Sequence, residues 1–418
     1  MSEENYYSDF NNNTWIKNGH SFFDISSNKI ISLKTRKSHS EELFEMAENY
    51  YYTAYNVADH ICENQTDNAL VDAWTLSCIY MFRQAIELLI KSGISKKSKT
   101  SVAMEIFQKS SHSLIKLYNE LIGLYSTGNL QTQQHEWLKK YFQNIEDLDS
   151  KSDLFRYPIN MVKTFGIDDF DIFGDVEDVN IDQYAIFNKF SISYCFAYKI
   201  IFNKDKDKDK DKDEEYDISN YEATLFDIAP HGMGYCSLCG HLWKQRDDFY
   251  MNIEGFSEVG IYLLKKMYET NENKFFFPAC FMFRNAIELT FKRFLVLSTE
   301  IKLKKEEIKK VEKSHRLKDI WSKYRFIVER YAKKMGSDLD TLEIVDAYIF
   351  ELDSIDKNSD AFRYPCNKSF EFYFKDKDMD YINAIRWLGE LFNFFDSCYD
   401  MMDDMLDYEN ESKNNSFF

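Results

Sequence analysis

Two stretches of the chain carry an arginine, a glutamate and a lysine at intervals of four residues. They are Arg83, Glu87 and Lys91 in the first stretch, and Arg284, Glu288 and Lys292 in the second. On a helix this spacing puts the three side chains on one face, with the glutamate between two cations. The apolar neighbours predict a buried helix, so we expect Glu87 to lie buried beside Arg83, Lys91 or Arg156. Each stripe is either an internal ion-pair ladder or the polar wall of a ligand site that binds phosphate.

A histidine follows each charged stripe, at His112 and at His315, in a Ser-His-x-Leu stretch at the start of the third predicted helix. There it either caps the helix or points into the helical bundle. Lysines precede both histidines: Lys96, Lys97 and Lys99 in the first case, and Lys302, Lys304, Lys305, Lys309, Lys310 and Lys313 in the second. In an acidic chain these are the main basic clusters, and they are either solvated loop charge or a rim that attracts anions.

An arginine closes the pattern in both stretches. Arg156 and Arg363 each stand in a Phe-Arg-Tyr-Pro block, which predicts a turn after the fourth helix. Asp153 and Asp360 precede them as carboxylate partners, so each arginine can hold down helix ends. An arginine beside a histidine can instead form an acid–base or phosphate-binding pair. The candidate catalytic residues are therefore His112, Arg156, His315 and Arg363, and the two charged stripes are the candidate ligand-binding residues.

The order of these blocks indicates an internal repeat. MFRQAIELLIK at 81–91 matches MFRNAIELTFK at 282–292 in eight of eleven positions. The histidine block and the Phe-Arg-Tyr-Pro block follow in both copies, with only small changes in spacing. Three matches in the same order predict a tandem duplication.

Helical periodicity in both copies predicts an all-α fold of two tandem antiparallel helical bundles joined by a charged linker. We expect an irregular N-terminal arm (1–39), a first bundle (40–203), a Lys/Asp linker (204–215), an insert with Cys and His (216–246), a second bundle (247–408) and a tail (409–418). A Ser38–Glu41 capping box opens the first helix. The later helices of the first copy are expected over 68–92, 102–124, 131–148 and 183–202. Those of the second are expected over 247–270, 277–298, 304–334, 338–354 and 378–406.

Composition narrows the class of protein. With 13 Gly and 4 Pro, the chain has too few turn residues for an all-β fold. A net charge of −18 argues against a protein that coats duplex DNA with a basic surface. The chain has no apolar run of membrane-spanning length, and its first residues lack the layout of a signal peptide, so we expect no membrane contact. The eight scattered cysteines are interpreted as reduced thiols, which predicts a cytoplasmic protein.

One segment outside the repeat, PHGMGYCSLCGHLW at 230–243, carries Cys236 and Cys239 as a Cys-x-x-Cys pair. Such a pair is half of a zinc site, but the second half is absent at the usual distance. Ordinary thiols are therefore the alternative. The chain has no Gly-rich phosphate loop, no Gly-x-Ser-x-Gly motif and no His-Glu-x-x-His motif. We assign no metal and no cofactor.

The ordered motifs resemble the HEPN domain family. The pattern is Ala-x-Glu-x-x-x-Lys, then His-x-Leu, then Arg-Tyr-Pro. It occurs at 85–91, 112–114 and 156–158 in the first copy, and at 286–292, 315–317 and 363–365 in the second. The resemblance covers most of both predicted bundles and leaves out the arm, the linker and the insert. It implies an all-α bundle, often paired so that two domains face each other.

The resemblance also implies a function. Many HEPN proteins bind or cleave RNA in toxin–antitoxin, phage-defence or stress systems, and others bind nucleotides. The RNA-cleaving members carry an arginine followed about four to six residues later by a histidine on one helix, and no pair with that spacing occurs near any of the eight histidines, since Arg36 and His39 are too close and lie outside the predicted bundles. We therefore expect an RNA- or nucleotide-binding protein with a protein partner from the same defence system. A divergent metal-independent ribonuclease that uses the repeated His and Arg is one alternative, and a non-catalytic protein-interaction scaffold is another.

Overall fold

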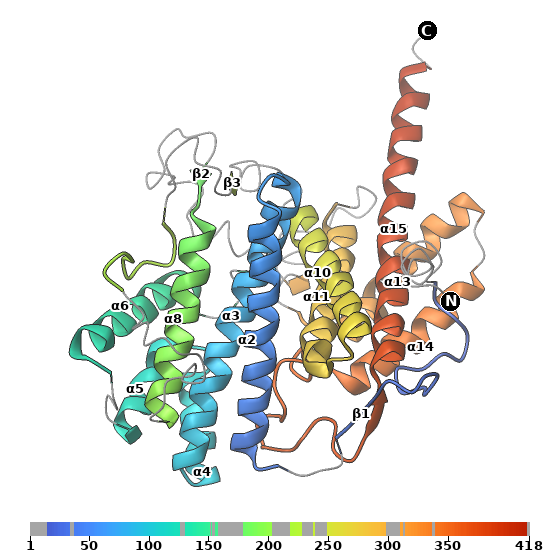
Figure 1. Cartoon of the computed structure of the whole chain (residues 1–418). Helices are drawn as coiled ribbons and strands as arrows, with labels where there is room; N and C mark the ends of the chain where they lie inside the picture. Colours follow the sequence, from blue (N-terminus) through green and yellow to red (C-terminus); the bar gives the residue numbers. More distant parts are fainter. Residues whose placement is uncertain are drawn as a thin grey trace. The chain divides into compact units, whose positions relative to one another are not determined.

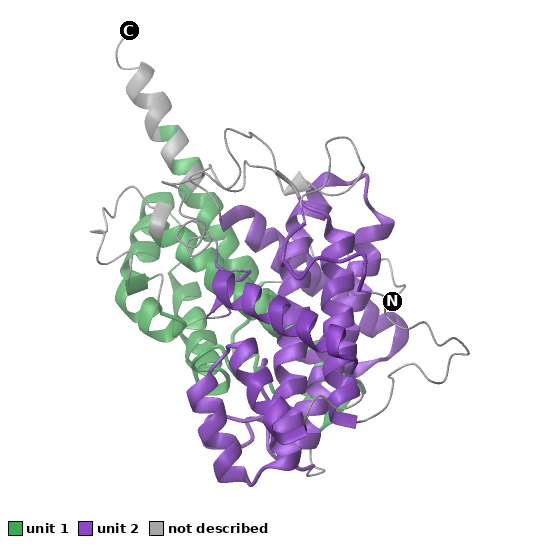
Figure 2. Ribbon diagram, turned by 90° about the vertical axis from the view of Figure 1, so that its left-hand side faces the viewer, with its two compact units in different colours: residues 1–34, 279–362, 376–418 green, residues 35–278, 363–375 purple. Residues whose placement is uncertain are grey.

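The computed structural model describes residues 15–33, 37–125, 130–150, 152, 155–157, 179–202, 218–227, 237–238, 249–297, 310–311, 314–336 and 339–415. Within these ranges the chain forms eleven α-helices and only strands of two or three residues, so the fold is all-α as the sequence predicts. The chain divides into two compact units, coloured separately in Figure 2. These units are defined by contacts between Cα atoms, whereas the predicted repeat is defined by matching residues in the sequence. The tandem duplication and its domain limits therefore remain predictions.

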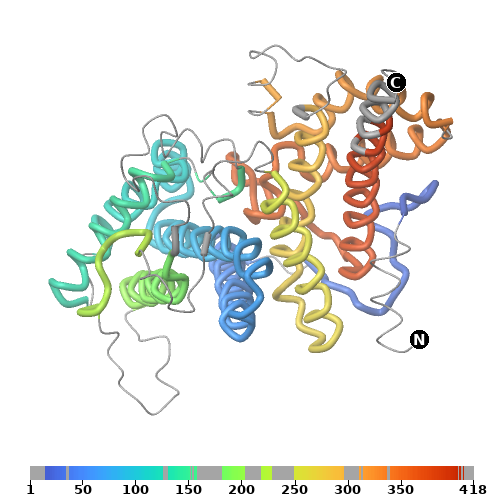
Figure 3. Tube along the Cα trace, turned by 90° about the horizontal axis from the view of Figure 1, so that it is seen from above, coloured from blue at the N-terminus to red at the C-terminus, as the bar shows by residue number. Residues whose placement is uncertain are grey.

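Unit 2 (residues 35–278 and 363–375) is built around one buried helix, α3. Its α-helices are α2 (His39–Glu63), α3 (Asn68–Lys97), α4 (Thr100–Ser110), α5 (Leu114–Tyr125), α6 (Thr132–Asp149), α8 (Gln183–Phe202) and α10 (Phe249–Thr270), labelled in Figure 1. Every residue of α3 from Val71 to Ile94 is buried, because α2, α4, α5, α8 and α10 all pack against it. Figure 3 shows α2 beside α3. The short helix η2 (Asn273–Phe275) and the paired strands β2 (Val179–Asn180) and β3 (Ser237–Leu238) also belong to this unit.

Unit 1 comprises residues 1–34, 279–362 and 376–418. It contains most of α11 (Phe276–Leu297) together with α13 (Leu317–Met335), α14 (Asp340–Ile355) and α15 (Tyr381–Asn415). Strands β1 (Ile30–Ser32) and β4 (Asp378–Asp380) pair antiparallel, with Ile31 opposite Met379. Aromatic rings form the core: the Phe291 ring centre lies 5.7 Å from that of Trp321 and 4.7 Å from that of Phe395. These contacts join α11 to α13 and α15.

The helix that opens unit 2 starts at the predicted capping box. Ser38 Oγ accepts from the backbone N–H of Glu41 at 3.3 Å, and Glu41 Oε2 accepts from the backbone N–H of Ser38 at 2.8 Å. The two bonds satisfy donors that the first turn of a helix otherwise leaves unpaired. This prediction is confirmed.

The third predicted helix is interrupted at the histidine in both copies. Residues 111–113 separate α4 from α5, and residues 314–316 precede α13 without helical conformation. Ser111 has a φ of 52°, a left-handed conformation that stops α4. The prediction of one continuous helix through each histidine is wrong, because the turn leaves the histidine carbonyl free to accept a hydrogen bond from a buried arginine.

Some predicted features lie outside the described residues. They include the Lys/Asp run of the linker and the thiols of Cys236 and Cys239, so the structure does not bear on either. None of the helices in the described ranges is both long and apolar enough to cross a membrane.

Candidate functional site

Glu87 is the centre of a buried ionic cluster in unit 2. It is fully buried on α3, with Lys91 Nζ 2.6 Å from its Oε1 and Arg83 Nη1 3.3 Å from its Oε2. Burial alone would raise the pKa of the Glu87 carboxyl, but Lys91, His112 and Arg83 outweigh it and hold that pKa well below its usual range. Glu87 is therefore a carboxylate. The expectation that it lies buried beside Arg83 and Lys91 is confirmed.

Arg83 connects three parts of unit 2. Its Nη2 donates to the His112 carbonyl at 2.9 Å and to the Asp149 carbonyl at 3.3 Å. Its Nε lies 3.0 Å from Asp149 Oδ2, which adds an ion pair. Arg83 is fully buried, so these contacts clamp the α4–α5 turn and the end of α6 onto α3. The clamp positions His112 against Glu87. Direct contact of Arg83 with a ligand remains a prediction.

His112 joins the buried cluster to the surface. Its Nδ1 lies 3.1 Å from Glu87 Oε1, and a carboxylate can only accept, so the ring hydrogen is assigned to Nδ1. Burial lowers the pKa of His112 by more than the charge of Glu87 raises it. The ring is therefore neutral at pH 7, with Nε2 unprotonated, and its side chain is 30% exposed. A histidine base oriented by a buried carboxylate is the result.

Tyr364 completes this cluster from a distant part of the sequence. Its hydroxyl donates to Glu87 Oε1 at 2.7 Å and lies 3.1 Å from His112 Nδ1. Lys91 Nζ lies 4.8 Å from the centre of the Tyr364 ring, a cation–π contact. Burial, with the charge of Glu87, raises the pKa of Tyr364 well above its usual value, so the phenol stays a donor.

Unit 1 contains a second cluster with matching contacts. Lys292 Nζ and His315 Nδ1 lie 2.7 and 3.0 Å from Glu288 Oε1, and Arg284 Nη1 donates to Glu288 Oε2 at 3.1 Å. Arg284 Nη2 donates to the His315 carbonyl at 2.7 Å, and its Nε lies 3.4 Å from Asp356 Oδ2. Glu288 is fully buried and its pKa is lowered, because Lys292 and its other partners outweigh the effect of burial. The His315 side chain is 34% exposed.

The arginines of the two Phe-Arg-Tyr-Pro blocks both lie in unit 2 and are buried. Arg156 Nε donates to the Ser152 carbonyl at 2.9 Å, and its guanidinium lies 5.8 Å from the centre of the Tyr80 ring. Burial raises the pKa of Tyr80, while the charges of Arg363 and Arg156 oppose that rise. Arg363 also helps to lower the pKa of His112. The predicted partner Asp153 lies outside the described residues.

The first lysine cluster lies at the junction of α3 and α4, with two of its three lysines in the last turn of a helix. Lys96 and Lys97 form the last turn of α3 and Lys99 is the N-cap of α4, and all three are exposed. Lys96 Nζ lies 4.4 Å from the centre of the Phe202 ring, and Lys97 Nζ lies 5.1 Å from that of Tyr125. Of the second cluster, the structure describes Lys310.

Two carboxylates of the site were missed, although the sequence contains a signal for them. Asp149 and Asp356 pair with the stripe arginines, and both stand seven residues before the arginine of their Phe-Arg-Tyr-Pro block. The ungapped pattern Asp-x-x-Ser-Asp-x-Phe-Arg-Tyr-Pro aligns them. The serine of this pattern, Ser152 or Ser359, has a φ of 61° in both stretches. Tyr364 lies within a motif that was identified, but no local pattern predicts which glutamate it reaches.

No family model, curated protein or solved structure matches the chain. Among the described residues, no group of three or more His, Cys, Asp or Glu is arranged to hold a metal ion. The function is therefore inferred from the two Glu–His clusters and the order of their motifs.

Proposed function

We propose that this protein is a tandem HEPN-like protein that binds RNA or a nucleotide, with a protein partner, in a phage-defence, toxin–antitoxin or stress-response system. The observation that carries the proposal is the pairing of a buried glutamate with a partly exposed histidine, made twice with matching contacts. Because the arginine, the glutamate and the lysine are buried in both clusters, a ligand meets the histidine first. A cytoplasmic location belongs to the same proposal and is based on the reduced cysteines.

The chemistry of the His112 ring favours a ligand with hydroxyl groups. A neutral imidazole with the hydrogen on Nδ1 offers Nε2 as an acceptor, which a ribose hydroxyl can satisfy. Lys91 and Arg363 supply positive charge near the ring, which opposes the negative charge of Glu87 there and can attract a phosphate. Ribose and phosphate together define a nucleotide.

The lysines at the end of α3 provide positive charge beyond this site. Lys96 lies nine residues after Glu87, which is about 13 Å along the helix axis and roughly two and a half turns on, so a bound strand must pass around the end of α3 to reach it. Lys96, Lys97 and Lys99 are exposed, and two of them lie over aromatic rings. A site of this length, with phosphate-binding lysines at one end and a hydroxyl acceptor at the other, suits a nucleic acid strand better than a single phosphate.

Binding of labelled single-stranded RNA, and separately of labelled ATP, tests the proposal by fluorescence anisotropy across a salt series. We expect affinity to fall steeply with salt, because bound phosphates release counterions. The triple change Lys96→Glu, Lys97→Glu and Lys99→Glu should weaken RNA binding by roughly tenfold or more and flatten the salt slope. The matched control changes Lys139, Lys140 and Lys265, three exposed lysines of unit 2, to Glu. Equal loss in both variants, or no binding by the wild type, contradicts the proposal.

A metal-independent ribonuclease is the second candidate, and the orientation of His112 by Glu87 favours it. In this mechanism His112 Nε2 removes the proton of a ribose 2′-hydroxyl, whose oxygen then attacks the adjacent phosphorus. The 5′-oxygen leaves as the P–O bond breaks and takes up a proton from water, and the His112 imidazolium returns its proton to the solvent. Arg156 or Arg363, both buried, stabilises the charge on the phosphorane through the electrostatic field of the site. His315, with Glu288, provides the same base in unit 1.

Cleavage assays in EDTA distinguish the two candidates. Binding without cleavage supports the first proposal, whereas cleavage that His112→Ala or His315→Ala abolishes, with binding retained, supports the ribonuclease. His135→Ala is the control, because that histidine of α6 bonds to Tyr118 and lies outside both clusters. A protein that neither binds nor cleaves leaves only the scaffold that holds a protein partner.

A further inference from the structure

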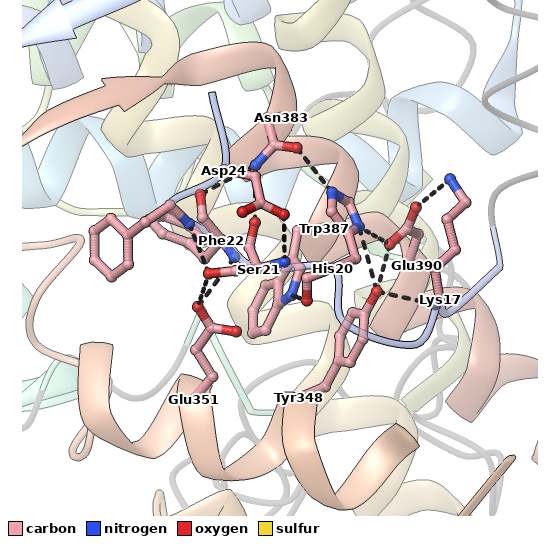
Figure 4. Close-up of polar contacts among 11 residues, drawn as sticks. Lys17, His20, Ser21, Phe22, Asp24, Tyr348, Glu351, Asn383, Trp387 and Glu390 are labelled. Atoms are coloured by element: carbon pink, nitrogen blue, oxygen red, sulfur yellow. Dashed lines mark hydrogen bonds and ion pairs between the residues drawn. The ribbon is translucent and has the colours of Figure 1, made fainter. Parts of the chain in front are cut away.

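A histidine ring is central to the attachment of the N-terminal segment, residues 15–33, to helices α14 and α15 of unit 1. His20 Nδ1 lies 2.6 Å from Glu390 Oε2, and His20 Nε2 lies 2.8 Å from Asn383 Oδ1 (Figure 4). Glu390 is fully buried, and the His20 side chain is 14% exposed. Both ring nitrogens thus face oxygen atoms inside the unit.

The orientation of Asn383 determines the protonation of this ring. Asn383 Nδ2 donates to the carbonyls of Ser21 and Phe22 at 2.9 and 3.2 Å. If the Asn383 amide were flipped, its oxygen would face the two carbonyl oxygens, which is repulsive. Asn383 Oδ1 must therefore point at His20, where it can only accept a hydrogen bond. The Glu390 carboxylate also only accepts. Both ring nitrogens must therefore carry hydrogen, which makes His20 an imidazolium.

We propose that His20 is a pH-sensitive latch, which helps to hold residues 15–33 on α14 and α15 while it is an imidazolium and loosens the segment as the pH rises. A neutral ring has one N–H. If the hydrogen is on Nδ1, the lone pair of Nε2 faces Asn383 Oδ1. If the hydrogen is on Nε2, the lone pair of Nδ1 faces the Glu390 carboxylate. Either way a donor–acceptor contact becomes repulsive, at a position where most of the His20 side chain is shielded from solvent.

The other polar groups around the ring cannot replace the lost proton. Lys17 Nζ lies 2.9 Å from Glu390 Oε1 and the Tyr348 hydroxyl donates to Glu390 Oε2 at 2.6 Å, so the carboxylate stays ionised. Burial raises the pKa of Glu390, but His20, Tyr348 and Lys17 outweigh it and the net pKa is lowered. The Tyr348 hydroxyl is also 3.3 Å from His20 Nδ1 and accepts from the backbone N–H of Lys17. These groups leave no second donor for Asn383 Oδ1.

The segment has further contacts that do not involve the ring, namely the pairing of β1 with β4, hydrogen bonds to two other carboxylates and the packing of Phe22. Glu351 of α14 accepts from Ser21 Oγ and from the Phe22 N–H. Asp380 accepts from the backbone N–H groups of Ser26 and Ser27. Phe22 is buried, with its ring 5.8 Å from that of Trp387. Deprotonation of His20 therefore loosens the segment without removing every anchor.

The direction of the pH effect follows from the pKa of His20. The Glu390 hydrogen bond raises that pKa above its ordinary value of 6.5, against the opposing effect of burial. The stabilisation is complete below pH 6.5 and is lost as the pH rises through the folded-state pKa. The segment is thus held most firmly in mildly acidic solution.

An NMR titration of the full chain, labelled at histidine Cε1, tests the protonation directly. We expect the His20 resonance, assigned by its loss in His20→Gln, to titrate with a midpoint above 6.5. Glu390→Gln should lower that midpoint by about one unit or more, since it removes the paired charge. Glu351→Gln is the matched control, because it removes a carboxylate that binds the segment but not the ring, and it should leave the midpoint unchanged. A wild-type midpoint at or below 6.5 overturns the proposal, whatever the variants do.

Hydrogen–deuterium exchange tests the loosening of the segment. After correction for the intrinsic pH dependence of exchange, protection of peptides within 15–33 should fall several-fold as the pH passes the His20 midpoint. Peptides of α3 in unit 2 provide the internal control and should keep their protection. Protection of the segment that stays constant through the titration overturns the latch, even where His20 titrates as expected.

Discussion

Glu87 and Glu288 each satisfy a buried charge with several donors rather than with one partner. Each accepts from an arginine and a lysine of its own helix and from a histidine of the following turn. Burying a carboxylate is costly unless every oxygen is paired, and these contacts meet that condition. The same donors orient the histidine, so the stability of each cluster and its chemistry depend on the same bonds.

Replacement of Glu87 by alanine should destabilise the protein by about 3–5 kcal/mol, the scale for breaking a buried ion pair. The change leaves Lys91 and Arg83 buried beside an empty position. Chemical denaturation followed by circular dichroism measures the effect. Glu105→Ala, on the exposed side of α4, is the control and should stay within about 0.5 kcal/mol of the wild type. An unchanged midpoint for Glu87→Ala would show that the cluster does not contribute to folding.

The pKa of His112 should lie below 6.5, so it is shifted in the opposite direction from the pKa of His20. Because burial disfavours the imidazolium, the unfolded chain binds a proton more readily than the folded protein as the pH falls below 6.5. The folded state therefore loses stability there. His112→Asn keeps a donor toward Glu87 and removes the titration, so its stability should depend less on pH between 6.5 and 5. A wild-type His112 that titrates above 6.5 by NMR contradicts the assignment.

At the scale of elements, the close approach of α3 and α10 within unit 2 depends on a glycine. A Cβ at Gly255 would lie 1.9 Å from the Ala73 carbonyl oxygen, and Ser77 Oγ donates to the Gly255 carbonyl at 3.3 Å. Backbone atoms cannot move aside as a side-chain end can. The two helices must therefore separate when the glycine is replaced.

Gly255→Ala should destabilise the protein by about 2–3 kcal/mol, the range for overpacking a tight contact. Gly123→Ala on α5 is its control, since a Cβ there meets no atom. That change should stabilise the protein by about 0.5–1 kcal/mol, because alanine favours the helix. Denaturation midpoints of the two variants should lie on opposite sides of the wild type, and a shared direction would contradict this description of the contact.

Segment 363–375 is held in unit 2 by Tyr364, so loss of its hydroxyl should loosen that segment. Tyr364→Phe removes the donor to Glu87 and keeps the ring against Lys91. We expect a loss of about 1.5–3 kcal/mol, as for a hydrogen bond to a charged group. Faster hydrogen exchange in peptides within 363–375 checks the location of the effect. Tyr184→Phe, at an exposed position of α8, should change neither quantity.

At the scale of the whole molecule, the 70 acidic side chains make the chain strongly anionic, and three of the buried carboxylates are stabilised in their ionised form by their partners. The pKa values of Glu87, Glu288 and Glu390 are all lowered by their cationic and hydrogen-bonding partners, which overcome burial. The stabilisation from each is complete above pH 4.5 and is lost as the pH falls through the lowered pKa.

Unfolding free energy should therefore fall steeply below pH 4.5. Urea titrations at a series of pH values measure this dependence. The double variant Glu87→Gln, Glu288→Gln should be less stable at pH 7 and should lose less on acidification, because two of the three titrations are gone. An acid dependence equal to that of the wild type would place the sensitive carboxylates elsewhere.

The sequence by itself determined the features that depend on local order. Helical periodicity and the scarcity of Gly and Pro predicted the all-α class, and most helix limits followed, as for α8 at 183–202. The Ser38 capping box and the burial of Glu87 were also predicted, because a cap involves adjacent residues and a charge inside an apolar helix must be paired. Each argument uses residues within a few turns of one another.

Only the tertiary structure decided which distant groups meet. Tyr364 reaches Glu87 across 277 positions, and His20 reaches Glu390 across 370. The helix break at His112 has the same origin, since the arginine that binds its carbonyl is 29 positions away. Periodicity indicates which face of a helix is buried, but the residues that contact that face depend on the tertiary packing of distant segments. The protonation of both histidines, and hence their proposed roles, depends on these tertiary contacts.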